Sequence, residues 1–159
     1  MADDDGARSL AELLDVDAID LDAGADSKEA AVRACGEALV RVGAVQPAYV
    51  DAMLERERTI STYVGEGVAI PHGTLAGKEA VVRDALCYLR FADPIDWGDG
   101  EQVSVCVGIA AAGDGHVEVL AQLAQVLMDP DQAQALRDAT RPEDVLRVLQ
   151  PTEEEATSS

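Results

Sequence analysis

Apolar residues recur along this chain with two different periods, and the periods divide it into helices and strands. An apolar residue at every third or fourth position predicts a helix that runs to Gly43. Asp26 or Ser27 is expected to cap its N-terminus, and Glu29 gives this start a capping-box character. Pro47 suits the first turn of a second helix. Helical spacing predicts the full set at residues 28–43, 48–58, 116–127, 131–138 and 142–149.

Shorter apolar runs predict the strands. Ile19 and Leu21 alternate with acidic residues, which is typical of a short edge strand. Further strands are expected at 68–70, 85–91 and 103–112. The last of these is apolar on one face and carries only small side chains on the other, which favours a central strand covered on both sides. The intervening segment DPIDWGDG, with the single tryptophan Trp97, is expected to be a loop.

Strands alternating with helices indicate an α/β fold. We expect a mixed, mostly parallel sheet of about five strands, flanked by helices on both faces, in a single domain spanning residues 1–150. Its core is placed at roughly residues 19–149. The polar tail at residues 151–159 is expected to be disordered.

The composition supports a globular domain whose cysteines are reduced thiols. No apolar run approaches the roughly 20 residues that a membrane-spanning helix needs, and the acidic start MADDDGARSL lacks the apolar core of a secretory signal. We therefore expect a cytoplasmic protein without direct membrane insertion. The three cysteines (Cys35, Cys87 and Cys106) lie in apolar, periodic segments and are expected to be buried thiols and not a disulfide framework.

The charge balance excludes some classes of partner. The chain has 31 acidic and 12 basic residues, a net charge of -19. Such a field repels nucleic acids and anionic membranes, so neither is expected as a partner. Two interpretations stay open: the acidic surface favours a basic protein partner, or it is a solvated surface suited to a salty cytoplasm.

Both histidines stand at element boundaries. His72 follows a predicted strand and Pro71, and His116 begins a predicted helix after a Gly-Asp-Gly turn. Loops at the carboxyl ends of strands gather at one edge of an α/β sheet, so the two loops meet if their strands are neighbours. A histidine near a turn is also compatible with a surface residue that only satisfies a hydrogen bond.

Neutral imidazole is a nucleophile near pH 7 and suits reversible phosphoryl transfer. A phosphoryl group brings almost two negative charges that something must offset. Candidates are the backbone N–H groups of Gly73 and Thr74, the Thr74 hydroxyl, His116, and Arg56 or its neighbour Arg58. Neither a zinc nor a calcium spacing occurs, nor does a nucleotide-binding glycine motif, so we expect no metal and no cofactor.

The segment GEGVAIPHGT (residues 65–74) strongly resembles the EIIA components of the mannitol/fructose class of the phosphoenolpyruvate-dependent sugar phosphotransferase system. Upstream, YVDAMLERERTISTYVGEG matches the family's Arg-Glu pair at Arg56 and Glu57. Downstream, GIAAAGDGHVEVLAQLAQVL resembles the second signature, a strand followed by a helix that begins with a histidine. The resemblance runs from about residue 28 to residue 149, and Thr74 and Lys78 look most like the mannitol type.

The resemblance implies a route for the phosphoryl group: from the carrier HPr to His72, as tele-phosphohistidine, and then to a cysteine of an EIIB or EIIBC protein. It implies that His116 and Arg56 help to hold the group, and that the permease domain, not this chain, contacts the sugar. One alternative is a nitrogen-type EIIA that signals through its phosphorylation state. The threonine at position 74 is evidence against this alternative. Another is a binding module that has lost the chemistry, which the retention of His72, His116 and Arg56 opposes.

Overall fold

The computed structural model describes residues 10–98, 100–111 and 115–149, without the side chains of residues 75, 76, 78 and 115–118. Along the chain the elements are α1 (Leu10–Leu13), β1 (Leu14–Ala23), α2 (Lys28–Arg41), α3 (Ala48–Thr59), β2 (Tyr63–Gly65), β3 (Val68–Ala69), the 3₁₀ helix η2 (Leu75–Ala80), β4 (Ala85–Gly98), β5 (Glu101–Ala110), α4 (Gly115–Met128), α5 (Pro130–Arg137) and α6 (Pro142–Leu149).

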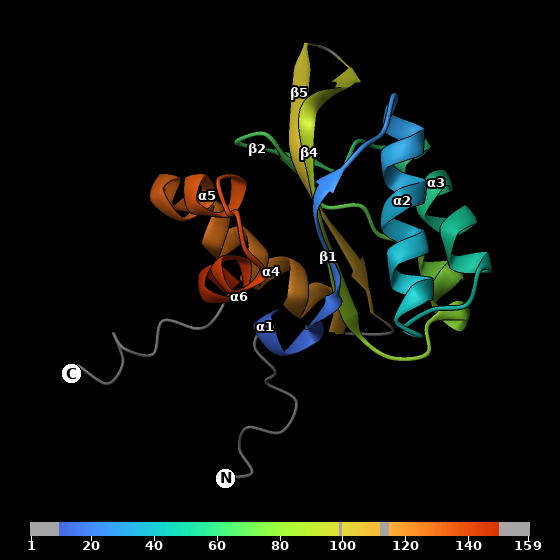
Figure 1. The fold of residues 1–159 in the computed structure, drawn as a ribbon. Coiled ribbons are helices and arrows are strands. Elements are labelled where there is room, and N and C mark those ends of the chain that lie inside the picture. Colours follow the sequence, from blue (N-terminus) through green and yellow to red (C-terminus); the bar gives the residue numbers. More distant parts are fainter. Residues whose placement is uncertain (1–9, 99, 112–114, 150–159) are drawn as a thin grey trace, which may run out of the picture.

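The five strands form one sheet in the order β1-β4-β5-β3-β2. The pairs β1/β4 and β3/β5 are parallel, whereas β4/β5 and β2/β3 are antiparallel. Helices α2 and α3 cover one face of the sheet, and α1 with α4, α5 and α6 lie on the other (Figure 1). The predicted mixed α/β sheet with helices on both faces is confirmed, with as many antiparallel as parallel pairings.

The central position predicted for β5 is also confirmed, and its small side chains explain how α2 approaches the sheet. Gly108 lies opposite Cys87 of β4. A Cβ atom at Gly108 would stand 2.6 Å from the Cys87 sulfur and 3.1 Å from the Cys35 Cβ on α2. Only glycine allows this contact. All three cysteines lie in the described part of the chain as buried free thiols, as the sequence predicts.

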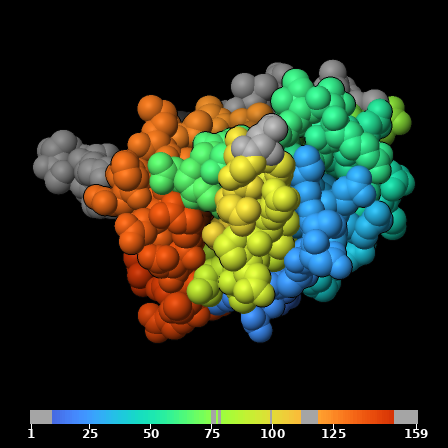
Figure 2. All heavy atoms as spheres, turned by 90° about the horizontal axis from the view of Figure 1, so that it is seen from above, coloured from blue at the N-terminus to red at the C-terminus, as the bar shows by residue number. Residues whose placement is uncertain are grey.

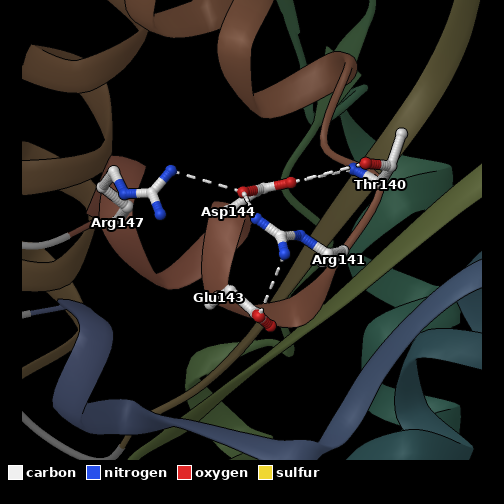
Figure 3. Close-up of polar contacts among 5 residues, drawn as sticks. All are labelled: Thr140, Arg141, Glu143, Asp144 and Arg147. Atoms are coloured by element: carbon white, nitrogen blue, oxygen red, sulfur yellow. Dashed lines mark hydrogen bonds and ion pairs between the residues drawn. The ribbon is translucent and has the colours of Figure 1, made fainter.

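One polar contact ties α5 to the sheet, and a local cluster of polar contacts stabilises the start of α6. The hydroxyl of buried Tyr88 on β4 donates to the Leu136 carbonyl oxygen at the end of α5. At the start of α6, Asp144 accepts hydrogen bonds from the Thr140 N–H and hydroxyl, and forms ion pairs with Arg141 and Arg147 (Figure 3). The acidic side chain near the helix N-terminus also complements the helix dipole.

The segment DPIDWGDG is not the loop that the sequence predicts, because β4 continues through it to Gly98. Ile95 and Trp97 are buried and alternate with exposed residues, and Ile95 pairs with Val103. Pro94, which suggested a loop, lies in the register shift between Arg90 and Ile95, where a bulge tolerates a missing N–H. The long β4–β5 hairpin lies between the C-terminal helices and α2 (Figure 2).

Three short elements have no counterpart among those predicted from the sequence: α1, β2 and η2. Leu10 and Leu13 of α1 and Leu14 of β1 are buried in the same core as the sheet. The polar tail predicted at residues 151–159 lies outside the described residues. Among the helices that are described, none is both long and apolar enough to cross a membrane.

Candidate phosphoryl-accepting site

His72 lies just beyond the end of β3, beside the central strand β5. Val68 and Ala69 pair in parallel with Val105 and Cys106, and a further isolated parallel bridge joins His72 to Ile109. The Ile109 N–H donates to the Pro71 carbonyl oxygen at 2.9 Å. The His72 side chain is only 5% exposed. His72 thus follows the short strand and Pro71 directly, and it lies beside the C-terminal end of β5.

The His72 ring is oriented by its own backbone. Its Nδ1 lies 2.9 Å from the carbonyl oxygen of Ile70. A carbonyl oxygen only accepts hydrogen bonds, so this contact assigns the proton of the neutral ring to Nδ1. The lone pair is then on Nε2. This arrangement makes Nε2 the nucleophilic nitrogen of the ring.

A buried carboxylate holds the backbone of Ile70 in place through Thr62. The Ile70 N–H donates to the Thr62 carbonyl oxygen at 3.0 Å. Glu57, at the end of α3, accepts from both the N–H and the hydroxyl of Thr62, and from the Trp97 indole N–H at 2.9 Å. Its side chain is 5% exposed. Three donors thus satisfy a buried charge, as its desolvation requires.

Glu57 was not predicted as a site residue and stood out in the sequence only as half of the Arg-Glu pair. A signal was available, because Glu57 follows Val50 and Leu54 at helical spacing on the buried face of α3. A charged residue on such a face is seldom buried without partners.

Tyr49, on the first turn of α3, holds the other side of the His72 turn. Its hydroxyl donates to the Ile109 carbonyl oxygen at 2.9 Å and accepts from the Gly73 N–H at 2.9 Å. Burial raises the pKa of this phenol, which keeps it protonated as a donor. A Cβ atom at Gly73 would stand 2.5 Å from Cε1 of the ring, so only glycine fits here. Sequence reasoning missed Tyr49, since aromatic residues on a buried helix face ordinarily indicate core packing.

Gly73 and Thr74 were predicted as donors to the phosphoryl group. In the structure the Gly73 N–H is taken up by Tyr49, so donation to a phosphoryl group requires that bond to be exchanged. The half-buried Thr74 caps the next turn: its carbonyl oxygen and its hydroxyl both accept from the Gly77 N–H, at 3.0 and 3.1 Å. The Thr74 hydroxyl keeps its own proton for another acceptor.

His116 and Arg56 are the predicted helpers. His116 lies in the first turn of α4, which follows β5, and β5 is the parallel neighbour of the strand that precedes His72. The condition for the two loops to leave the same edge of the sheet is therefore met; the His116 side chain lies outside the described part. Arg56 is half-buried, and its guanidinium donates to the Ile60 carbonyl oxygen at 2.7 Å, at the end of α3.

The described residues contain no group of three or more His, Cys, Asp or Glu side chains suited to hold a metal ion.

Comparison with known proteins identifies the family. The chain is 41% identical over 137 residues to the mannitol-specific phosphotransferase enzyme IIA component of Halalkalibacterium halodurans, covering 86% of this chain and 94% of that protein. It is also 41% identical to the multiphosphoryl transfer protein of Escherichia coli O157:H7. That match covers 79% of this chain but only 33% of the longer protein.

Solved structures agree. The complex of enzyme IIAMTL with phosphorylated enzyme IIBMTL from Escherichia coli matches with a TM-score of 0.79 and 33% identity, covering 86% of this chain and 98% of that one. The nitrogen regulatory protein IIA-Ntr of Neisseria meningitidis matches with a TM-score of 0.75 and 30% identity, covering 88% and 98%. The family described as "Phosphoenolpyruvate-dependent sugar phosphotransferase system, EIIA 2" matches residues 12–151. The chain belongs to this family and is a phosphotransferase component of the EIIA type.

Proposed function

We propose that this protein carries a phosphoryl group on Nε2 of His72, receiving it from phosphorylated HPr and passing it to a cysteine of an EIIB domain. The observation that carries this assignment is the 2.9 Å contact between His72 Nδ1 and the Ile70 carbonyl oxygen. It directs the lone pair to Nε2. It also stabilises the positive charge that spreads over the ring when Nε2 bonds to phosphorus.

The transfer is a simple displacement. The Nε2 lone pair attacks phosphorus in line with the bond to the donor histidine of HPr. That bond breaks, and its electron pair stays on the donor ring. His72 retains its Nδ1 proton throughout, bonded to Ile70. In the second step the EIIB thiolate attacks phosphorus, and the Nε2–phosphorus bond returns its electron pair to His72.

The helpers belong to the same proposal. His116 and Arg56 would offset the charge of the phosphoryl oxygens, and the Thr74 hydroxyl would donate to one of them. Gly73 would contribute its N–H only if its bond to Tyr49 opens. We propose that the sugar served is a polyol, mannitol, because two relatives of similar length to this chain, covered to 94% and 92%, are mannitol-specific. The three free thiols fit work in the reducing cytoplasm.

Intact-mass measurement tests the acceptor. The wild type, incubated with phosphoenolpyruvate, enzyme I and HPr, should gain one acid-labile phosphoryl group. His72→Ala should gain none. His116→Ala and Arg56→Ala should gain the group at a reduced rate, since they retain the acceptor. A His72→Ala protein that is phosphorylated like the wild type would overturn the assignment.

A regulatory role is the alternative, favoured by the match to the nitrogen regulatory IIA of Neisseria meningitidis. The two functions share the first transfer and differ in the second. Adding a mannitol-type EIIB to the isolated phosphoprotein separates them. Loss of the group from His72 with its gain by EIIB supports transport, and retention on His72 supports regulation.

A further inference from the structure

The Tyr49 hydroxyl occupies a place in the hydrogen-bond ladder between the His72 segment and β5. In a parallel ladder, a residue such as Ile109 bonds through its N–H to the residue before its partner and through its C=O to the residue after it. Here the first bond is direct: the Ile109 N–H donates to Pro71. At the place of the second bond, the Tyr49 hydroxyl accepts from the Gly73 N–H and donates to the Ile109 carbonyl oxygen.

Both peptide groups that flank His72 are therefore tied to Ile109, one directly and one through a side chain. The Tyr49 oxygen lies 2.9 Å from both the Gly73 nitrogen and the Ile109 carbonyl oxygen, so a side chain links the two backbones at this point. The position of Gly73 sets the path of the backbone at His72, and so the position of its ring.

The hydroxyl is well held in this role. Tyr49 is 2% exposed, so water does not compete for its hydrogen bonds. Its ring lies against Gly73, where a Cβ atom would overlap it. The residue is anchored in the first turn of α3, and its own N–H donates to the Gln46 carbonyl oxygen.

We propose that Tyr49 is a positioning residue for phosphoryl transfer: its hydroxyl ties Gly73 to Ile109 and thereby sets the place from which His72 attacks. The inference rests on the proposed function, because it concerns the reaction of His72. Tyr49 does not touch the phosphoryl group; it acts through the backbone of Gly73.

The Y49F variant removes the hydroxyl and keeps the ring. Gly73 N–H and Ile109 C=O then lose their shared partner, and because unpaired buried backbone groups are costly, the turn shifts to satisfy them in another way. His72 moves with it. A displacement on the order of 1 Å at a reacting group lowers a rate by up to about a hundredfold. We expect Y49F to accept the phosphoryl group from phosphorylated HPr roughly ten- to a hundredfold more slowly, in kcat, with KM for HPr little changed.

Tyr88 supplies a matched control. It is also a buried tyrosine whose hydroxyl donates to a backbone carbonyl, that of Leu136, but it packs toward α5 on the other face of the sheet. Y88F should transfer within about twofold of the wild type. Denaturant unfolding of both variants checks that each is folded at the assay temperature.

Nitrogen NMR gives a readout that general destabilisation does not move. The His72 ring nitrogens and the Gly73 amide should shift in Y49F and stay unchanged in Y88F. In the wild type, exchange of the Gly73 amide proton with solvent should be slow, which tests the bridge without any substitution. Wild-type kcat in folded Y49F, unchanged His72 signals, or fast exchange at Gly73 would each overturn the inference and leave the proposed function standing. A wild type that accepts no phosphoryl group would instead overturn the proposed function.

Discussion

The Nδ1 atom of His72 lies 2.9 Å from the carbonyl oxygen of Ile70, two residues earlier in the chain. The contact is local, but the carbonyl that makes it is placed by distant residues. The Ile70 N–H donates to the Thr62 carbonyl oxygen, and the Thr62 N–H donates to the Glu57 carboxylate. The same carboxylate accepts from the indole N–H of Trp97, near the C-terminal end of β4. The ring's orientation thus depends on how α3 and the β4–β5 hairpin pack together.

Replacing the buried carboxylate should loosen this arrangement. In Glu57→Gln the amide oxygen can accept from both N–H groups at the Oε2 position, and the NH₂ group can donate to the Thr62 hydroxyl, but the negative charge that strengthens these bonds is lost. Hydrogen bonds to a charged group contribute about 1.5–3 kcal/mol, so we expect a loss of about 2 kcal/mol in the free energy of unfolding. Urea unfolding followed by the fluorescence of Trp97, the single tryptophan, measures it. Glu55→Gln, an exposed site on the same helix, is the control. Equal stability of the two variants would contradict the claim that the Glu57 carboxylate stabilises the fold.

A methyl group at Gly73 tests the close approach of Tyr49. In Gly73→Ala the new Cβ would lie 2.5 Å from the Tyr49 ring, so the ring or the turn must move. Overpacking of this kind costs about 1–3 kcal/mol. Gly24→Ala is the matched control, because nothing lies within 4 Å of its Cβ position, and its stability should stay within about 0.5 kcal/mol of the wild type. Denaturant unfolding compares them. Identical midpoints for the two variants would show that the turn accommodates a side chain.

Acid should weaken the start of α6. Partial desolvation by itself would raise the pKa of Asp144, but the hydrogen bond from the Thr140 N–H and the charges of Arg141 and Arg147 together hold this pKa below its ordinary value. A carboxyl group with a lowered folded-state pKa stabilises the fold above its unfolded pKa and loses that contribution as the pH falls through the folded value.

Thermal unfolding of Asp144→Asn and the wild type at a series of pH values measures this effect. The wild type should be the more stable protein near neutral pH, and the difference should shrink below about pH 4. A difference that stays constant down to pH 2 would mean that the ionised carboxylate is not what stabilises the helix.

Local signals predicted most of the fold. Ser27 does cap α2, accepting from the Ala30 N–H, and the apolar periods placed helices α2 to α6 and the central strands. The error at residues 93–98 has a physical cause: Pro94 and Gly98 are turn residues by local preference, yet burial of Ile95 and Trp97 against the core extends the strand. Tertiary packing overrode propensity there.

Some residues of the site could likewise be predicted from the sequence, whereas others could not. His72 stands in a motif that can be found in the sequence. Tyr49 and Glu57 act through contacts with residues up to 60 positions away, as between Tyr49 and Ile109. No pattern in the sequence pairs those positions. The bond that sets the tautomer of His72 becomes visible only once β3 and Pro71 are placed.

The most direct test of the account is a long-range proton–nitrogen NMR spectrum of the protein after phosphorylation by phosphoenolpyruvate, enzyme I and HPr. The account predicts a single phosphohistidine at His72, with phosphorus on Nε2 and a proton retained on Nδ1 by the bond to Ile70. A phosphoryl group on Nδ1, or on a residue other than His72, would contradict it.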